Sequence, residues 1–461
     1  MHGTGRAGEQ PEIIAEVAAA LLLVGAMVFG GGSRGAGDAV VHLLAIPALW
    51  LAITRWTRAE HHATATATHV HAGRAARWFA YWLTAAALLV VLQLLPIPVS
   101  LFARLPQRAD VLADLQQAGM QRAWLPTTLD VWGTVRSGLA LATFAAMALL
   151  AMTLSQAARR RLLTLALLLA VPMALLGFAQ AAAGQAPGLR FHDYHHPMGA
   201  IGLFANRNHF ADLLGMLLPF ALLFAVQAQS RQQRALAMAW YALIVILMLA
   251  IALSFSRAGI ALAALAVATI LVLLRPQGGR SRHLMPLLAF GIAALGIATY
   301  AWSGIVDRLA LDPLADLRWQ YLHYGREALA AWWPVGSGFG TFRDVYAPFE
   351  PVSAMTNVHA LHAHNDLLEL LIEGGAMGLI LLGGLIALLV GSFSKIRNSL
   401  QYESLNARRL HLACTVSCVV PLLHSLVDYP LRTLAIAVPF GLALSVALVT
   451  GPASPRHQIA G

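Results

Sequence analysis

Three histidines and an asparagine lie where a polar segment meets a long apolar run: His359, His362, His364 and Asn365. Asp366 and Glu369 follow at the spacing of a capping box, which predicts that a helix starts here. The positive end of a helix dipole disfavours an imidazolium, so an imidazole at this point is expected to stay neutral and able to act as a general base. The alternative interpretation is that these histidines only cap the helix and hydrate a boundary. The residue types alone leave both interpretations open.

Two arginines stand at the starts of earlier apolar runs, each beside hydrogen-bonding residues. Arg207 follows Asn206 in FANRNHFADLL, and Arg257 lies in the short turn SFSRAG. An arginine in the apolar region costs about 2.5–3.5 kcal/mol on insertion scales, so it normally faces a cavity or a partner. Guanidinium groups bind phosphate oxygens bidentately, which predicts an anion site here; anchoring to lipid headgroups is the alternative. Glu373 is expected either to orient an arginine or to form a structural ion pair.

This combination of side chains fits one kind of chemistry at a membrane surface. Transfer of a sugar from a lipid-linked diphosphate needs positive charge for the departing diphosphate and a base for the acceptor hydroxyl. It does not need the paired carboxylic acids of glycoside hydrolysis. The sequence has no D-x-D motif and no evident carboxylate cluster that would hold a divalent cation. We therefore predict transfer that requires no metal and no other cofactor.

The composition assigns these residues to a membrane protein. Hydrophobic residues make up 59% of the 461, charged residues only 11%, and the mean hydropathy is +0.68. These values predict an all-α polytopic membrane protein. The net charge of +10 is spread through loops between apolar runs, so it indicates orientation in the bilayer and not nucleic-acid binding. Cys414 and Cys418 lie one turn apart in an apolar run and are expected to pack between helices, not to form a disulfide or a zinc site.

About twelve apolar windows have the length of a membrane span. They lie near 13–30, 38–53, 78–95, 131–154, 162–182, 209–228, 236–254, 258–274, 284–303, 366–392, 410–427 and 433–449. The first window lacks a convincing cleavage site and is interpreted as a span, not as a removed signal peptide. The predicted division is spans one to nine in 1–303, a loop segment in 304–365 and spans ten to twelve in 366–461.

The arginines predict how these spans are oriented. With the N-terminus in the cytoplasm, every second loop is cytoplasmic. Those loops carry Arg55, Arg58, Arg74, Arg77, Arg159, Arg160, Arg161, Arg231, Arg234, Arg275, Arg280, Arg282, Lys395, Arg397, Arg408 and Arg409. This asymmetry satisfies the positive-inside rule and predicts that both termini are cytoplasmic.

Two long loops are then expected on the outer side. Residues 96–130 predict a helix along the membrane surface, and residues 304–365 predict an aromatic-rich helix that leads into the histidines. Between the aromatic-rich helix and the histidines, the segment PVGSGFGTF has three glycines but no following lysine. It therefore predicts tight turns and not a phosphate-binding P-loop.

Three blocks of this sequence, in the same order, resemble the O-antigen ligase/polymerase superfamily of bacterial membrane glycosyltransferases. They are GLFANRNHFADLLGMLLPFAL, SFSRAGIAL and the stretch from REALAAWWPVGSGFGTFRDVY through HAHNDLLELLIEGGAMGL, which together span roughly 200–385. The His-x-His-Asn block is the most specific of the three, and the first five spans match in hydropathy only. The resemblance implies a GT-C-type fold of about twelve helices, with a large periplasmic loop between spans 9 and 10.

The resemblance also implies an activity. Such proteins sit in the bacterial inner membrane and move a glycan from undecaprenyl diphosphate to an acceptor hydroxyl in the periplasm, with inversion and without metal. The expected partners are the lipid-linked glycan donor, lipid A-core or another glycan acceptor, and membrane lipids. We interpret the chain as an O-antigen ligase of lipopolysaccharide assembly. A polysaccharide polymerase, a pilin O-oligosaccharyltransferase and a transporter with buried charges are the alternatives.

The family's essential residues carry over to named positions. They are Arg207, Arg257 and the pair His362 and His364, with Arg326 as a less certain match. His364 is expected to be the base, with Asn365 or His362 holding its ring in the correct tautomer. The remaining candidates for substrate binding are His359, Asn206 and Glu373.

Overall fold

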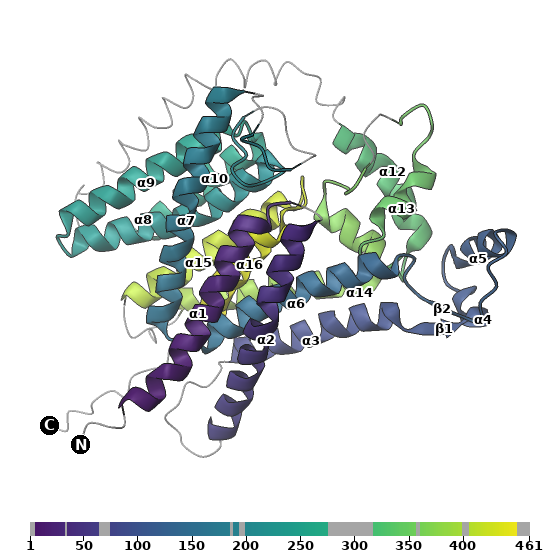
Figure 1. The fold of residues 1–461 in the computed structure, drawn as a ribbon, viewed down its shortest axis with the longest axis horizontal. Coiled ribbons are helices and arrows are strands. Elements are labelled where there is room, and N and C mark those ends of the chain that lie inside the picture. The colour runs from purple at the N-terminus through teal and green to yellow at the C-terminus, as the bar shows by residue number, and fades with distance from the viewer. Residues whose placement is uncertain are drawn as a thin grey trace.

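The computed structural model describes residues 5–32, 35–63, 74–184, 188–192, 199–274, 317–355, 360–398 and 405–449. Within these ranges the chain is helical apart from one two-stranded antiparallel sheet and the connecting loops (Figure 1). Eight helices are long and apolar enough to cross a membrane, and two shorter ones are also apolar. The all-α polytopic fold is therefore confirmed. The predicted ninth span, 284–303, lies outside the described residues.

Eleven of the predicted windows coincide with helices in the described ranges. These helices are α1 (Gly5–Phe29), α2 (Ala36–Ala63), α3 (Arg74–Leu94), α6 (Val131–Thr153), α7 (Gln156–Ala183), α8 (Arg207–Ser230), α9 (Arg234–Leu253), α10 (Arg257–Leu273), α14 (Asp366–Asn398), α15 (Leu405–His424) and α16 (Leu434–Leu448). Their agreement follows from the length of the apolar runs, which is the most reliable signal in a membrane protein sequence.

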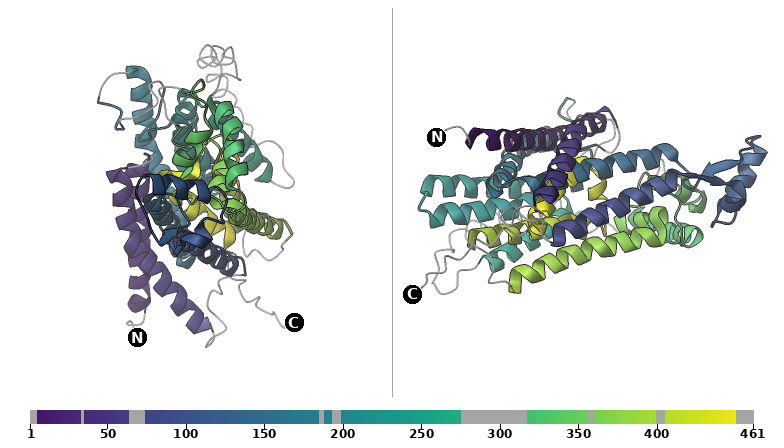
Figure 2. Two further views of the ribbon diagram at one scale, coloured as in Figure 1. Left: turned by 90° about the vertical axis from the view of Figure 1, so that its right-hand side faces the viewer. Right: turned by 90° about the horizontal axis from the view of Figure 1, so that it is seen from below.

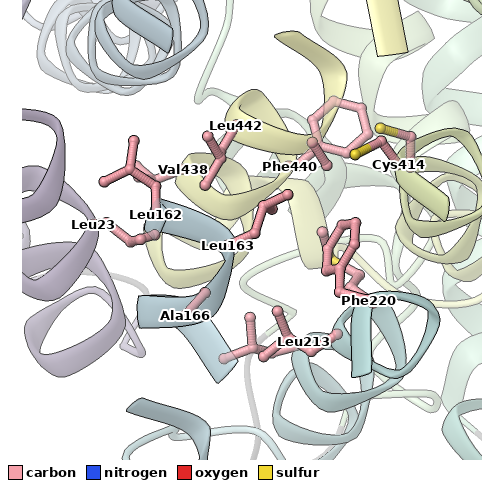
Figure 3. Close-up of a cluster of buried hydrophobic side chains, with 14 of the residues drawn as sticks. Leu23, Leu162, Leu163, Ala166, Leu213, Phe220, Cys414, Val438, Phe440 and Leu442 are labelled. Atoms are coloured by element: carbon pink, nitrogen blue, oxygen red, sulfur yellow. The ribbon is translucent and has the colours of Figure 1, made fainter. Parts of the chain in front are cut away.

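Helix α8 is the centre of the bundle. It is buried along its apolar length and packs against α7, α9, α10 and α15. Figure 3 shows Phe220 of α8 beside Leu163 of α7, Cys414 of α15 and Phe440 of α16. A helix that is apolar all round is expected at such a position. The two cysteines are buried and not bonded to each other, as predicted.

A smaller group of elements lies beyond one end of the bundle. The chain from α3 to α6 forms β1 (Pro96–Pro98), α4 (Val99–Phe102), α5 (Arg108–Gln117) and β2 (Trp124–Pro126), and this part projects at the far right of Figure 2. The loop before α14 contains α12 (Leu317–Trp332), α13 (Phe342–Tyr346) and η2 (Ala347–Phe349). Helices α5 and α12 are the two that the sequence predicts in its long outer loops.

A buried arginine joins these two loops. Arg108 of α5 donates from Nη2 to the carbonyl oxygens of Thr127 and Gly336, each at 2.7 Å. Its guanidinium carbon lies 4.8 Å from the ring centroid of Trp332 in α12. Burial lowers the pKa of Arg108 to about 10, so the guanidinium stays charged at neutral pH. The segment from β1 to β2 and the loop after α12 are therefore one packed unit.

The glycine-rich loop fixes a kink in α14. Gly336 and Gly375 both have positive φ, at +83° and +56°. A Cβ atom on Gly375 would lie 2.1 Å from the carbonyl oxygen of Pro334, and Ala376 donates its N–H to that same oxygen at 2.8 Å. The tight turns predicted for PVGSGFGTF are confirmed. Their function is to seat the loop against α14.

Polar helix ends gather at the end of the bundle that carries the two long loops. Gly30, just after α1, accepts a backbone hydrogen bond from Ala435 of α16, and Asp366 of α14 donates one to Ser425 after α15. At the opposite end, Arg161 of α7 forms a 2.6 Å ion pair with Glu16 of α1. The alternation of helix ends predicted from the loop charges is therefore present in the fold.

Candidate active site

Asn365 caps the start of α14. Its Oδ1 atom accepts the N–H of Leu368 at 3.0 Å, and its Nδ2 atom donates to the carbonyl of Leu426 at 3.0 Å. The predicted capping box of Asp366 and Glu369 is wrong, because the cap lies one residue earlier. Glu369 does not bond the cap residue but accepts the N–H of Ala363 at 2.9 Å. The helix starts where Asn365 satisfies a free N–H group.

His364 stands in the turn before this cap. Its φ of +48° is a left-handed conformation that is uncommon for a residue with a side chain. The ring Nδ1 atom lies 3.1 Å from Oδ1 of Asp428, and Nε2 has no hydrogen-bond partner among the described residues. The side chain is 29% exposed. The sequence predicted that Asn365 or His362 would hold this ring, whereas the structure places the Asp428 carboxylate there.

Asp428, in the turn after α15, is a buried hub. Its oxygens contact Asn208 Nδ2 at 2.6 Å, Tyr429 N at 3.0 Å, Arg318 Nη2 at 3.5 Å and His209 Nε2 at 3.6 Å. Burial by itself raises the pKa of Asp428. The hydrogen bond with His364 and the close approach of His209 outweigh that effect and hold the pKa well below its usual range. The carboxylate is therefore ionised at neutral pH and fixes the Nδ1–H tautomer of His364.

A second histidine–carboxylate pair lies beside the first. His362 Nδ1 is 2.8 Å from Oε1 of Glu369, and its side chain is 11% exposed. The ring of Tyr429 packs against both histidines, with centroids 4.1 Å from His362 and 5.0 Å from His364. On its other side His364 stacks on Tyr321 of α12 at 6.0 Å. Of the two rings, His364 is the more accessible to a substrate.

Arg432 binds three carboxylates of α14. The distances are 3.0 Å from Nε to Asp366, 3.1 Å from Nη1 to Glu369 and 3.0 Å from Nη2 to Glu373. Burial lowers the pKa of Arg432, but the carboxylates raise it by more, so the net direction is upward and the charge is permanent. The three carboxylates are close in sequence on α14, but the cation that they share lies 59 residues after Glu373.

Glu373 has both oxygens occupied. One accepts from Arg432, and the other accepts the N–H of Phe342 at 3.0 Å. The side chain is completely buried. Of the two interpretations left open by the sequence, the buried ion pair is the one present, and its arginine is neither Arg207 nor Arg257.

The two predicted arginines are the first residues of neighbouring helices. Arg207 starts α8 after Asn206, whose Oδ1 atom accepts the N–H of Asn208 at 2.9 Å. Arg257 is exposed and starts α10, behind a cap formed by Ser256. Asn208 is the next residue in the chain after Arg207, and it binds Asp428. This contact brings the start of α8 to the pair formed by His364 and Asp428.

The first turns of α8 and α10 are in close contact. A Cβ atom on Gly259 of α10 would lie 2.5 Å from Cβ of Ala211 in α8. Gly259 is two residues after Arg257, and Ala211 is one turn after Arg207. The two arginines therefore begin adjacent helices at the end of the bundle that carries the histidines. Arg326 is exposed on α12, and His359 lies outside the described residues.

Sequence reasoning missed four residues of this site: Arg318, Asp428, Tyr429 and Arg432. A signal for three of them was present. The segment DYPLR separates the windows 410–427 and 433–449, on the side predicted for the histidines. As in SFSRAG, charged residues in so short a turn between two spans are expected to face a cavity or a partner.

The bundle and its polar end define a multi-pass membrane protein with a site at which an ionised carboxylate orients an accessible histidine. A family model described as O-antigen ligase matches residues 241–383. This match supports the O-antigen ligase/polymerase superfamily and a glycosyltransferase type of activity. It includes Arg257, His362, His364 and Asn365, whereas Asp428 lies outside it. A search of curated proteins found no match.

Proposed function

We propose that this protein transfers a glycan from undecaprenyl diphosphate to an acceptor hydroxyl, and specifically that it ligates O-antigen to lipid A-core in lipopolysaccharide assembly. The observation that carries the proposal is the pair formed by His364 and Asp428, with Nδ1 held at 3.1 Å and Nε2 without a hydrogen-bond partner among the described residues. The family match supports the class of reaction. The ligase role is our choice among the members of that class.

In the proposed reaction, Nε2 of His364 accepts the proton of the acceptor hydroxyl. The oxygen then attacks the anomeric carbon of the donor from the face opposite the diphosphate. The bond between that carbon and the diphosphate oxygen breaks, and the configuration inverts. Asp428 stabilises the imidazolium that forms, because its charge is 3.1 Å from Nδ1. Tyr321 and Tyr429 hold the ring in place by contact.

The departing diphosphate needs positive charge, which Arg207 and Arg257 supply in this proposal. Each is the first residue of its helix, where the helix dipole also favours an anion. The guanidinium groups carry the charge that a metal ion supplies in other transferases, and for this reason we propose a metal-independent reaction. Asn206 and Arg326 are proposed to contact the glycan or the lipid diphosphate.

The face with the histidines is proposed to be periplasmic, with both termini cytoplasmic, in the bacterial inner membrane. The opposite end of the bundle carries Arg55 of α2, Arg161 of α7 and further basic residues at the starts of α7 and α15. Basic residues at helix ends favour the cytoplasmic side. A lipid-linked donor assembled for export would then meet the site on the outer surface.

The intermediate that accumulates in a deletion strain tests this role. A ligase predicts that full-length polymer remains attached to the lipid diphosphate, because polymerisation continues while transfer to lipid A-core stops. Single lipid-linked repeat units would instead identify a polymerase. Normal lipopolysaccharide with unglycosylated pilin would identify a protein glycosyltransferase. Donor confined to the cytoplasmic leaflet would identify a transporter.

A further inference from the structure

Five arginines from three helices gather at the end of the bundle opposite the histidines. They are Arg159 and Arg160 at the start of α7, Arg231 at the end of α8, and Arg408 and Arg409 at the start of α15. None of them forms an ion pair with a carboxylate of the described residues. Their neighbour Arg161 differs, because it binds both oxygens of Glu16 at 2.6 Å. We call the five the opposite-end arginine cluster.

Contacts between the helices show that this is one cluster. Arg159 interacts electrostatically with His411 of α15, which is one turn after Arg408. The guanidinium carbon of Arg160 lies 4.4 Å from the ring centroid of Phe224 in α8, and Arg160 is repelled by Arg231. Like charges held together at a membrane boundary are destabilising unless an anion lies among them.

Two buried side chains, one in the cluster and one on the neighbouring face of α8, have unused hydrogen-bonding capacity. Arg159 is 9% exposed, and its Nε atom has no partner among the described residues. Gln227 of α8 is 2% exposed, and neither its Nε2 nor its Oε1 atom has a partner. Buried polar side chains are nearly always paired, so an unpaired guanidinium nitrogen and an unpaired amide together indicate a ligand.

Helix periodicity aims these two groups at the same space. Arg159 is one turn before Leu163 on α7, and Gln227 is two turns after Phe220 on α8, so each shares a face with the residue named. Leu163 and Phe220 point into one buried group with Cys414 (Figure 3). Arg159 also interacts with Cys414. Both unpaired groups therefore face the junction of α7, α8 and α15.

We propose that the opposite-end arginine cluster binds the phosphate of an anionic phospholipid headgroup. The cluster lies at helix ends, where headgroups are found, and it runs from the exposed Arg231 to the buried Arg159. Guanidinium groups bind phosphate bidentately, and the Gln227 amide can donate to a remaining oxygen. Basic pockets between membrane helices bind such headgroups. The site is independent of the proposed transfer reaction and lies at the other end of the protein.

Lipid binding to the purified full-length protein tests this site. Native mass spectrometry in neutral detergent would compare phosphatidylglycerol with phosphatidylcholine. We expect preference for the anionic lipid in the wild type and in Arg161→Gln, whose guanidinium is already paired with Glu16. Arg159→Gln and Arg160→Gln should each bind it roughly tenfold more weakly, the effect of losing one charge-assisted hydrogen bond. Equal binding of both lipids would overturn the proposal.

A second variant keeps the test valid if Arg159→Gln fails to fold. Gln227→Leu removes the unpaired amide at similar volume, so it should raise the unfolding temperature in lipid-free detergent while weakening phosphatidylglycerol binding. Unchanged lipid binding in both Arg160→Gln and Gln227→Leu would contradict the site. Inorganic phosphate is the competing probe. If phosphate alone raises the unfolding temperature as much as phosphatidylglycerol does, the site takes a free anion and the lipid assignment is wrong.

Discussion

Burial and hydrogen bonding shift the pKa of the Asp428 carboxyl group in opposite directions. The pKa is held well below its usual range because the effects of His209 and His364 outweigh desolvation. A carboxyl group whose pKa is depressed by folding stabilises the folded state above its unfolded pKa of about 3.9, and the stabilisation is lost as pH falls further. The charge next to His364 is thus maintained through the physiological range.

This gives a pH-dependent prediction. The difference in stability between the wild type and Asp428→Asn should be fully present at neutral pH and should begin to shrink below about pH 4, where the unfolded carboxyl protonates. Thermal unfolding in detergent at stepped pH measures it. A difference that grows as the pH falls below 4 would show that Asp428 is not an ionised partner in the folded protein.

The arginines make a separate prediction at the residue scale. If Arg207 and Arg257 fork onto one diphosphate, Arg→Lys at either position should reduce transfer nearly as much as Arg→Ala, because lysine has no planar fork. Arg326→Lys, on the exposed face of α12, is the matched comparison and should have a weaker effect. Full activity of both lysine variants at 207 and 257 would reduce these residues to point charges or headgroup anchors.

At the scale of elements, α14 is held from three sides. Asn365 caps it, Arg432 pairs with its first two turns, and the loop containing Gly336 packs where the helix kinks at Gly375. Together these contacts fix the short segment that carries both histidines. The kink is Gly-specific, since its φ of +56° and ψ of −145° are hardly accessible to other residues.

Two alanine substitutions in α14 separate the kink from the rest of the helix. Gly375→Ala should strongly destabilise the protein and abolish transfer, because the new Cβ atom would lie 2.1 Å from the carbonyl oxygen of Pro334. In Gly383→Ala the new Cβ atom would have no other atom within 4 Å, so this substitution should stabilise the helix by about 0.5–1 kcal/mol. Unfolding temperatures of the two purified variants provide the comparison. Equal effects at both positions would remove the kink from this account.

The sequence predicted the helices well and the site in part, for physical reasons that differ. A span is a local property of about twenty apolar residues, so its position can be read without knowing its neighbours. The pairing of His364 with Asp428 joins residues 64 positions apart, and that of Gln93 with the Glu373 carbonyl joins residues 280 apart. No local pattern records such pairs. The residue types at helix ends were informative, but their partners required the fold.

At the scale of the whole molecule, the two ends of the bundle differ in how their arginines are neutralised. Near the histidines, Arg432 and Arg318 bind buried carboxylates. At the other end, the five arginines of the opposite-end cluster have no such partner among the described residues. This difference is consistent with a protein that performs chemistry at one membrane surface and contacts anionic lipid at the other.

The orientation follows as a prediction for the molecule as a whole. Alkaline phosphatase fused at position 340 should be active if the loop before α14 is periplasmic as proposed, and a fusion after position 400 should be inactive. A cytoplasmic reporter at the same two positions is the control and should give the reverse pattern. Activity of the phosphatase only after 400 would place the histidines in the cytoplasm, away from the proposed donor.

The most direct test of the central claim is transfer by purified His364→Ala. We expect a folded protein with a cooperative unfolding transition, normal binding of the lipid-linked donor, and transfer reduced by about 10²–10⁴-fold, the usual loss when a general base is removed. A capping role would instead cost about 1 kcal/mol of stability and leave transfer intact. If His364→Ala retains transfer while His362→Ala loses it, the base lies two residues earlier, paired with Glu369. If both variants retain full transfer, catalysis by histidine is contradicted.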